Sequence, residues 1–318
     1  MRIGLYRLAV LALWLAAVGW LVIHRILPSL LIGEPPVYES ASFDKPRPPV
    51  AWRLDLGGKP LGWAVSENIS TQATETTEIH SLVHFDGRRL EQLLPLAVRA
   101  SLLVGGQFAG PSEMEVESSM LINNPLKQVQ HFSTKLRTHP GTGQSLVYIT
   151  GDVDGDKLKL SFRIGEMALE NMEVSMPEYK IRDSFSPEME LRGLHLGQTW
   201  TIDTYSPLAL ASHPMDMLRK RPPTEVLLAT VEDRVPMVWN GKLQSTWLVV
   251  YRTDASQGPG SEKNIRNKLW VRKDGTVVRQ EVWLGDERLC FTRMPEKEAA
   301  QLLAERKDFQ SHQPAGQP

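Results

Sequence analysis

The stretch Leu269-Trp270-Val271-Arg272-Lys273-Asp274-Gly275-Thr276-Val277-Val278-Arg279-Gln280-Glu281 carries the pattern that decides the fold. Polar and apolar side chains alternate on both sides of Asp274-Gly275, and this alternation is the period of a β-strand. An Asp-Gly pair between two such runs favours a two-residue loop of type I′. The stretch therefore predicts an antiparallel β-hairpin.

The two-residue loop also determines which residues of the hairpin lie opposite each other. Trp270 then faces Arg279, and Lys268 faces Glu281 on the same surface. A cation–π contact is expected between Trp270 and Arg279. In this register the side chains that point to the opposite surface are Leu269, Val271 and Val278.

The same period of two recurs along most of the chain, for example in Lys157 to Phe162 and in Met114 to Glu117. In Trp247 to Tyr251 it places Trp247, Val249 and Tyr251 on one face of a strand. Turn signals separate the runs, and they include Asp86-Gly87, Asn123-Asn124-Pro125, Asp154-Gly155 and Asn240-Gly241. The pattern predicts a succession of antiparallel hairpins.

Two segments have the period of a helix instead. Residues 90–104 place leucine and valine side chains on one face, although Pro95 is expected to kink or split the helix. Residues 295–309 begin with a proline, followed by Glu296 and Glu298, and end near Arg306 and Lys307. The predicted fold class is α+β and mostly antiparallel β: a curved sheet or half-open barrel with a few helices on one face.

The N-terminal end, residues 1–27, is predicted to be a transmembrane anchor. The segment from Leu8 to Ile23 is uncharged and lies between Arg7 and Arg25, which can snorkel to the membrane surfaces. The positive charges before it predict a cytoplasmic N-terminus and an extracytoplasmic, periplasmic body held on the inner membrane by a single span. A cleaved signal peptide is the alternative, with a small-residue site at Ala17-Val18-Gly19.

The rest of the chain divides by composition. Residues 28–50 form a proline-rich linker, 51–309 a single β-rich extracytoplasmic domain, and 310–318 a disordered polar tail. The 36 Lys and Arg nearly balance the 37 Asp and Glu, which leaves no broad positive surface for nucleic acid. Cys290 is the single cysteine, so no internal disulfide can form, and it is expected to be buried in a strand.

No familiar catalytic or metal-binding pattern is complete. Asp152 to Asp156 has calcium-loop spacing, but Lys157 and Arg163 stand where the loop needs glycine and glutamate, so a hairpin turn is predicted. His80 and His84 would lie about 13 Å apart on a strand, too far apart to share a metal ion. Ser42-Phe43-Asp44-Lys45 lacks the companion motifs of penicillin-recognising enzymes. We therefore expect no enzyme activity, no metal and no cofactor.

Three stretches, read together, resemble a known group of proteins. These are Leu56-Gly57-Gly58-Lys59-Pro60-Leu61-Gly62-Trp63, Leu194-His195-Leu196-Gly197-Gln198-Thr199-Trp200 and the hairpin around Asp274-Gly275. Their order is similar to that in bacterial envelope domains that share the half-open β-barrel of lipoprotein-localisation carriers. The resemblance covers Trp52 to Arg293 and implies a curved antiparallel sheet with a concave apolar face. Such a face is suited to an acyl chain or to the hydrophobic segment of a partner.

Tryptophan is the residue that links fold to function, because seven of the nine tryptophans lie in the β-rich body and form either a core or the lining of a cleft. Both faces of Trp247 to Tyr251 are apolar, and two helices are few to cover both faces of a large sheet. We expect Trp200, Trp247 and Tyr251 to line a ligand-binding face. The predicted function is a non-enzymatic envelope module that binds a lipid-like ligand or an envelope protein. The alternatives are a structural subunit of an envelope assembly and, third, an enzyme of unfamiliar type.

Overall fold

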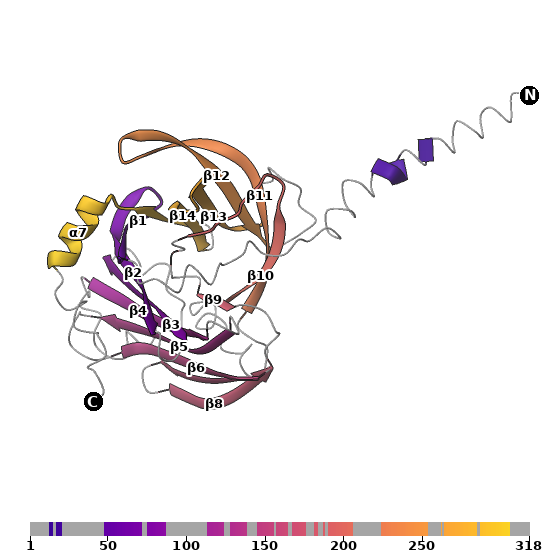
Figure 1. The fold of residues 1–318 in the computed structure, drawn as a ribbon. Coiled ribbons are helices and arrows are strands. Elements are labelled where there is room, and N and C mark those ends of the chain that lie inside the picture. Colours follow the sequence, from indigo (N-terminus) through magenta and orange to yellow (C-terminus); the bar gives the residue numbers. More distant parts are fainter. Residues whose placement is uncertain are drawn as a thin grey trace, which may run out of the picture.

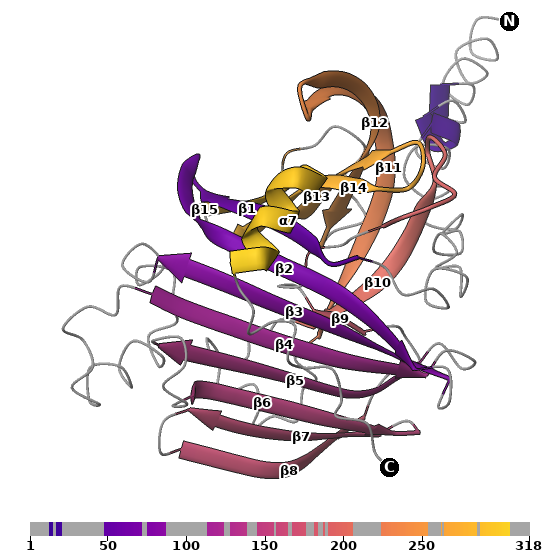
Figure 2. The same ribbon diagram turned by 60° about the vertical axis from the view of Figure 1, so that its left-hand side comes forward.

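The computed structural model describes residues 13–14, 17–20, 48–71, 75–86, 113–123, 128–138, 145–155, 157–164, 167–175, 181–183, 187, 190–205, 224–253, 262, 264–284 and 287–305. The body of these residues is one 15-stranded sheet with a single flanking helix, α7. The sheet is strongly curved, as Figures 1 and 2 show from two directions. The prediction of a curved, mostly antiparallel sheet with few helices is confirmed for this part of the chain.

The strands fall into two wings that follow one another along the chain. The first wing consists of β1 (Val50–Leu56), β2 (Lys59–Thr71), β3 (Thr76–Asp86), β4 (Glu113–Asn123), β5 (Gln128–Thr138), β6 (Ser145–Asp154), β7 (Lys157–Ile164) and β8 (Met167–Ser175). The second wing consists of β9 (Ile181–Asp183), β10 (Thr199–Tyr205), β11 (Thr224–Trp239), β12 (Lys242–Arg252), β13 (Ile265–Arg272), β14 (Val277–Leu284) and β15 (Glu287–Arg293). Helix α7 (Glu296–Glu305) follows the last strand.

Each wing is a meander in which neighbours along the chain pair antiparallel. The exception is the edge strand β9, which pairs parallel to β10. The wings join in the middle of the sheet, where β1 pairs with β15 and Trp52 lies opposite Arg293. The first and last strands of the domain are therefore neighbours.

The sheet has two faces with different chemistry. On the inner face, defined by Trp52, Leu54 and Phe291, side chains from both wings form one hydrophobic core. It includes Phe132, Ile149 and Phe162 from the first wing and Trp200, Val249, Tyr251 and Leu269 from the second. The two wings therefore share one cluster of buried residues.

Helix α7 covers part of the outer face, which is the side of the sheet opposite to this core. Ala299 of the helix packs on Ala51 of β1 and Val65 of β2 in a second small core. The chain is tied down before the helix, because the amide of Met294 donates to the carbonyl of Ala51 over 2.9 Å. The helix predicted over residues 295–309 is confirmed as far as Glu305, where the description ends.

Two of the hairpins turn as their sequences indicate. Asn240 and Gly241 have φ values of 51° and 68°, and they join Trp239 to Lys242 as a two-residue loop. Gly57 and Gly58, with φ values of 55° and 81°, do the same between Leu56 and Lys59. Both pairs have the positive φ at both positions that a type I′ turn requires.

The hairpin around Asp274-Gly275 has the predicted register but a different loop. Trp270 lies opposite Arg279, with the guanidinium carbon 5.4 Å from the ring centroid, and Lys268 lies opposite Glu281. The loop is not of type I′: Gly275 alone has positive φ, its amide donates to the Arg272 carbonyl, and the Arg272 amide donates to the Thr276 carbonyl. This is a three-residue loop.

A β-bulge compensates for the longer loop. The register shifts between Trp270 and Val271, and Val271 pairs with Val277. The shift restores the predicted pairs farther along the hairpin, but it also changes which valine joins the core. Val277 packs in the core with Leu269 and Val271, in place of the predicted Val278, although both valines are buried.

Several predictions lie outside the described residues. They are the linker from 28 to 47, the helix predicted over 90–104, the Ser42 motif and the tail. Of the predicted anchor, only residues 13–14 and 17–20 are described, and they are helical. No helix in the described part of the chain is long and apolar enough to cross a membrane.

Candidate functional site

Trp200 and Tyr251, two of the three predicted ligand-binding residues, lie together on the inner face. Ala229 on β11 pairs with Trp200 on one side and with Tyr251 on the other. The alanine leaves room above it, and the two rings meet edge to face with centroids 6.2 Å apart. Both side chains are fully buried, so they are part of the core that the two wings share.

Trp247 lies apart from this pair. It is on the same face of β12 as Tyr251, as predicted. It comes four residues before Tyr251, on the side of the Asn240-Gly241 turn, and it is only half-buried. Its partner across the strand pair is Arg234, whose guanidinium carbon lies 4.1 Å from the ring centroid. Trp247 therefore lies at the margin of the inner face, where the sheet is exposed to solvent.

Trp52 is a third tryptophan of the inner face, and the sequence did not single it out as a site residue. Its ring is fully buried, and the guanidinium carbon of Arg293 lies 5.9 Å from the ring centroid. The indole nitrogens of Trp52 and Trp200 are buried, and neither finds a hydrogen-bond acceptor among the described residues. The inner face thus holds two buried donors that an acceptor could satisfy.

A row of hydroxyl groups crosses the inner face of the first wing. Register places Ser66, Ser81, Ser118 and Thr134 side by side on β2 to β5, and all four are buried. The Ser66 and Ser81 oxygens lie 3.3 Å apart, and those of Ser118 and Thr134 lie 3.2 Å apart. Sequence reasoning missed this row, because it becomes visible only when four hairpins are aligned in register.

The outer face of the first wing carries a cluster of charged groups around His80. Its two ring nitrogens lie 3.5 Å from a carboxylate oxygen of Glu67 and 3.6 Å from one of Glu117. Arg137 completes the cluster with a nitrogen 2.7 Å from the other Glu117 oxygen. His84, on the same face of β3, stacks on Trp63 with ring centroids 5.1 Å apart.

His80 and His84 lie in different surroundings on β3. Both lie on a strand, as predicted, and each has its own carboxylate neighbours. In the described part of the chain, no group of three or more His, Cys, Asp or Glu side chains is placed to hold a metal ion. The charged cluster is a set of ion pairs on the sheet.

These neighbours change the acid–base behaviour of His80 and Glu117. Burial lowers the pKa of His80, but the hydrogen bonds and charges of Glu117 and Glu67 outweigh it and raise the pKa to about 9. The interaction with His80 lowers the pKa of Glu117 to about 2, against burial and with help from Arg137 and Lys135. At neutral pH the cluster therefore holds an imidazolium between two carboxylates.

Stability should consequently depend on pH through His80. A raised folded-state pKa contributes stability that is complete below pH 6.5 and is lost as pH rises through about 9. The loss should be on the order of 3 kcal/mol, and H80Q should remove most of it. Thermal unfolding of the full chain at pH 6 and pH 10 measures the difference.

The matched control is H84Q, which removes the other histidine from the same face of β3 and leaves the Glu67, His80 and Glu117 cluster in place. This variant should lose stability above pH 6.5 as the parent protein does. If H80Q retained the alkaline loss of stability, His80 would not be the titrating group. At the acidic end, the Glu117 contribution is present above about pH 4.5 and is lost as pH falls toward 2.

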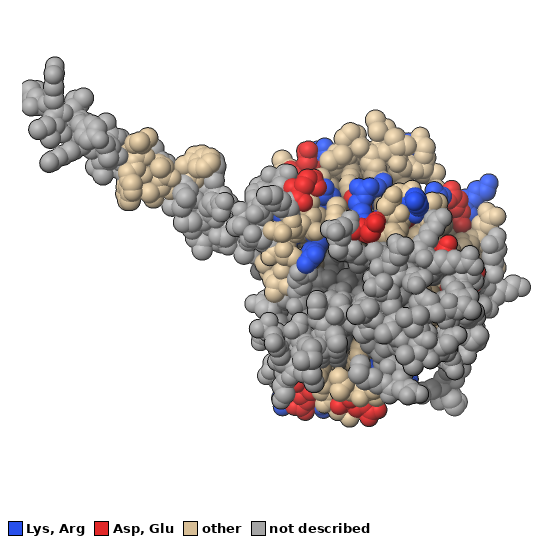
Figure 3. Space-filling model, turned by 180° about the vertical axis from the view of Figure 1, so that it is seen from behind, with Lys and Arg blue, Asp and Glu red and all other residues tan. Residues whose placement is uncertain are grey.

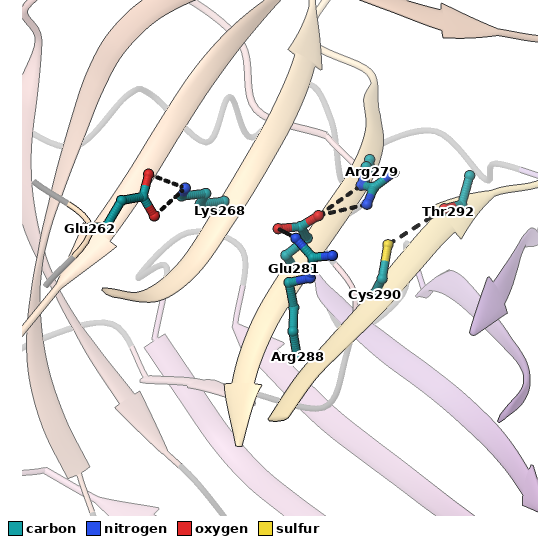
Figure 4. A network of polar contacts seen from close by, with 7 residues as sticks. All are labelled: Glu262, Lys268, Arg279, Glu281, Arg288, Cys290 and Thr292. Atoms are coloured by element: carbon teal, nitrogen blue, oxygen red, sulfur yellow. Dashed lines mark hydrogen bonds and ion pairs between the residues drawn. The ribbon is translucent and has the colours of Figure 1, made fainter. Parts of the chain in front are cut away.

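A second polar network lies on the outer face of the second wing (Figure 4). Glu281 accepts hydrogen bonds from Arg279 over 2.6 Å and from Arg288 over 3.4 Å. Cys290, on the neighbouring strand, is buried as predicted, and its sulfur lies 3.7 Å from the Thr292 hydroxyl. Burial raises the pKa of the Cys290 thiol, which keeps it protonated and unreactive at neutral pH.

The acidic stretch from Asp152 contributes to a hairpin, as predicted. Asp154 closes β6 opposite Lys157 of β7, and Gly155 in the loop has a φ of 62°. Asp152 pairs with His131 of β5 at 2.8 Å. Asp152 and Asp154 thus have roles in strand pairing and in the turn.

Comparisons with known proteins bring out similar solved structures. No known protein family and no curated protein matches its sequence. One similar solved structure is a β-barrel-like protein from Brucella abortus with a domain of unknown function, at 8% identity and a TM-score of 0.41. That alignment covers 77% of this chain and 94% of the other. Another is a protein from Pseudomonas aeruginosa, at 11% identity and a TM-score of 0.29, which covers 67% of this chain and 87% of the other. The predicted match to lipoprotein-localisation carriers is not among these findings.

Proposed function

We propose that this protein is a non-enzymatic binding module of the cell envelope whose inner face holds a lipid-like ligand. The observation that supports the proposal is the pair of buried indole donors of Trp52 and Trp200, which find no acceptor among the described residues. A buried donor without a partner costs about 1–3 kcal/mol, and native structures leave few of them. An ester or carboxyl oxygen of a ligand would supply the missing acceptor.

The surroundings of these donors suit an apolar chain. Leu54, Phe291 and Val249 are fully buried inner-face side chains of the same core. An amphiphile would place its hydrocarbon part against such side chains and its oxygen near an indole. The ligand class is therefore a fatty acid or a phospholipid.

The predicted location is compatible with this function. The N-terminal segment would hold the domain on the inner membrane, with its bulk in the periplasm, and the linker would let it reach lipids or envelope proteins. A tethered module of this kind would present or retain its ligand close to the membrane, because the anchor prevents free movement between membranes.

A structural role is the second candidate, and one observation favours it. Trp200 and Tyr251 are fully buried and pack edge to face, which is the behaviour of core residues. In that case the domain would serve as a rigid subunit of an envelope assembly.

Binding of cis-parinaric acid, a fluorescent fatty acid, distinguishes the two candidates. The full chain, stripped of lipid, should bind the probe saturably, and W200F should weaken binding about five- to tenfold because phenylalanine lacks the N–H donor. W270F is the control, since Trp270 lies on the outer face opposite Arg279, and it should bind as the parent does. The absence of saturable binding by the parent protein would favour the structural role.

A further inference from the structure

The hairpin of β11 and β12 is longer than the strands on either side of it. Pairing with β10 ends at Thr230, and pairing with β13 ends at Thr246. Beyond these points β11 and β12 pair only with each other, as far as the turn at Asn240-Gly241. Residues 236–245 therefore form a two-stranded segment, here named the projecting ribbon, which curves over one end of the molecule in Figure 1.

One side of the projecting ribbon is held against the body. The indole nitrogen of Trp239 donates to the carbonyl of Arg293 over 2.9 Å, and the Arg272 guanidinium carbon lies 5.4 Å from the same ring. At the base of the ribbon, the hydroxyl of Thr246 donates to the carbonyl of Val235. Two-stranded ribbons are only marginally stable alone, and these contacts fix the orientation of this one.

The other side of the ribbon exposes apolar side chains. Val238 and Leu243 lie opposite each other, and 66% and 73% of their surfaces are exposed. Pro236 and Ser245 form the next pair on this side, and both are exposed. Apolar side chains of this size are seldom left this exposed in adjacent positions unless they meet an apolar partner.

The projecting ribbon carries one charged side chain, the cation Lys242. At its base the Arg234 guanidinium lies over the Trp247 ring, and the Arg234 amide donates to the Asp233 carboxylate. Arg272 lies beneath the tip against the Trp239 ring and forms an ion pair with Asp274 over 3.2 Å. Figure 3 shows uncharged surface at the end of the molecule where Figure 1 places the ribbon, with acidic and basic side chains interspersed below it.

We propose that the projecting ribbon docks on an anionic lipid bilayer, with Val238 and Leu243 inserted between headgroups. An apolar tip with the Lys242 cation beside it matches the layers of a membrane surface, where the hydrocarbon boundary lies beneath anionic phosphates. A protein partner fits less well, because a stable interface covers about 800 Å² on each side and the tip is a narrow convex ribbon. Leu243 lies on the same side of β12 as Trp247, so this surface continues the inner-face side of the sheet beyond the strands that pair with β13.

A local probe tests this proposal in the full chain. L243C, in a C290S background, is labelled with the environment-sensitive dye NBD and mixed with vesicles of phosphatidylglycerol and phosphatidylcholine. We expect fluorescence to rise at least about twofold, as for a dye leaving water, and doxyl-labelled lipid to quench it. The dye reports its own surroundings, so the reading does not depend on where the N-terminal segment lies.

Three comparisons sharpen the test. K297C, labelled on the exposed side of α7, should show no quenching by doxyl lipid. K242A should weaken the L243C response about fivefold, which is the contribution of one cation near an anionic surface. Equal quenching in pure phosphatidylcholine, or no quenching in either vesicle, would overturn the proposal. A response that grows with protein concentration without lipid would overturn it in favour of contact between two copies.

Discussion

Replacing Trp200 by alanine should lower the free energy of unfolding by about 3–5 kcal/mol. The side chain is fully buried, and its ring meets Tyr251 edge to face above the small Ala229. Truncation removes the apolar surface of the indole and leaves a cavity that Ala229 cannot fill. Urea unfolding of the full chain, followed by circular dichroism, measures the change in midpoint.

The control for this prediction is W270A. Trp270 is half-buried on the outer face, where it contacts the Arg279 guanidinium, so its loss should cost clearly less than the loss of Trp200. Equal losses in the two variants would contradict the description of the inner face as the main core. Should W200A cost less than about 1 kcal/mol, Trp200 would have to lie in an open cleft.

Replacing Arg252 by methionine should cost about as much, 3–5 kcal/mol, for an electrostatic reason. Arg252 on β12 forms an ion pair with Glu232 of β11, and only 4% and 9% of the two side chains are exposed. Glu232 lies at the β-bulge between Val231 and Asp233. Methionine would keep the volume of the arginine but leave a buried carboxylate without this partner.

The double variant R252M/E232L separates the charge effect from packing. Because both charges are gone, it should recover at least half of the stability lost in R252M, as other buried ion pairs do when replaced by apolar residues. The exposed pair of Arg53 and Glu298 is the reference, and R53M should cost less than about 1 kcal/mol. A double variant less stable than R252M would show that the loss comes from packing.

The turns show how far sequence rules reach in this fold. Asn240-Gly241 forms the predicted tight turn because both residues adopt positive φ without strain. At Asp274-Gly275 only the glycine does so, and the aspartate instead accepts a hydrogen bond from the Thr276 amide over 3.0 Å. An Asp-Gly pair is compatible with a two-residue loop and with a three-residue loop, so the dipeptide alone does not determine the loop length. The register was still predicted correctly, because the bulge at Val277 and Val278 offsets the extra residue.

The candidate site was predictable only within single strands. Alternation along β12 placed Trp247 and Tyr251 on one face, and the structure agrees. The contact between Trp200 and Tyr251 depends on β10 and β12 lying on either side of β11, which no local pattern encodes. The same holds for Trp52, which reaches the core through the pairing of β1 with β15.

The pairing of β1 with β15 also has a consequence for the order in which the chain folds. During synthesis the first wing can form hairpin by hairpin, but one edge of β1 must wait for β15, nearly the whole domain later. At about 5–20 residues per second, that wait lasts on the order of tens of seconds. Throughout this time β1 offers unpaired backbone groups to any other strand. Release of an incomplete chain would therefore favour strand exchange between nascent copies, and a holding chaperone would be expected to bind before Arg293 is made.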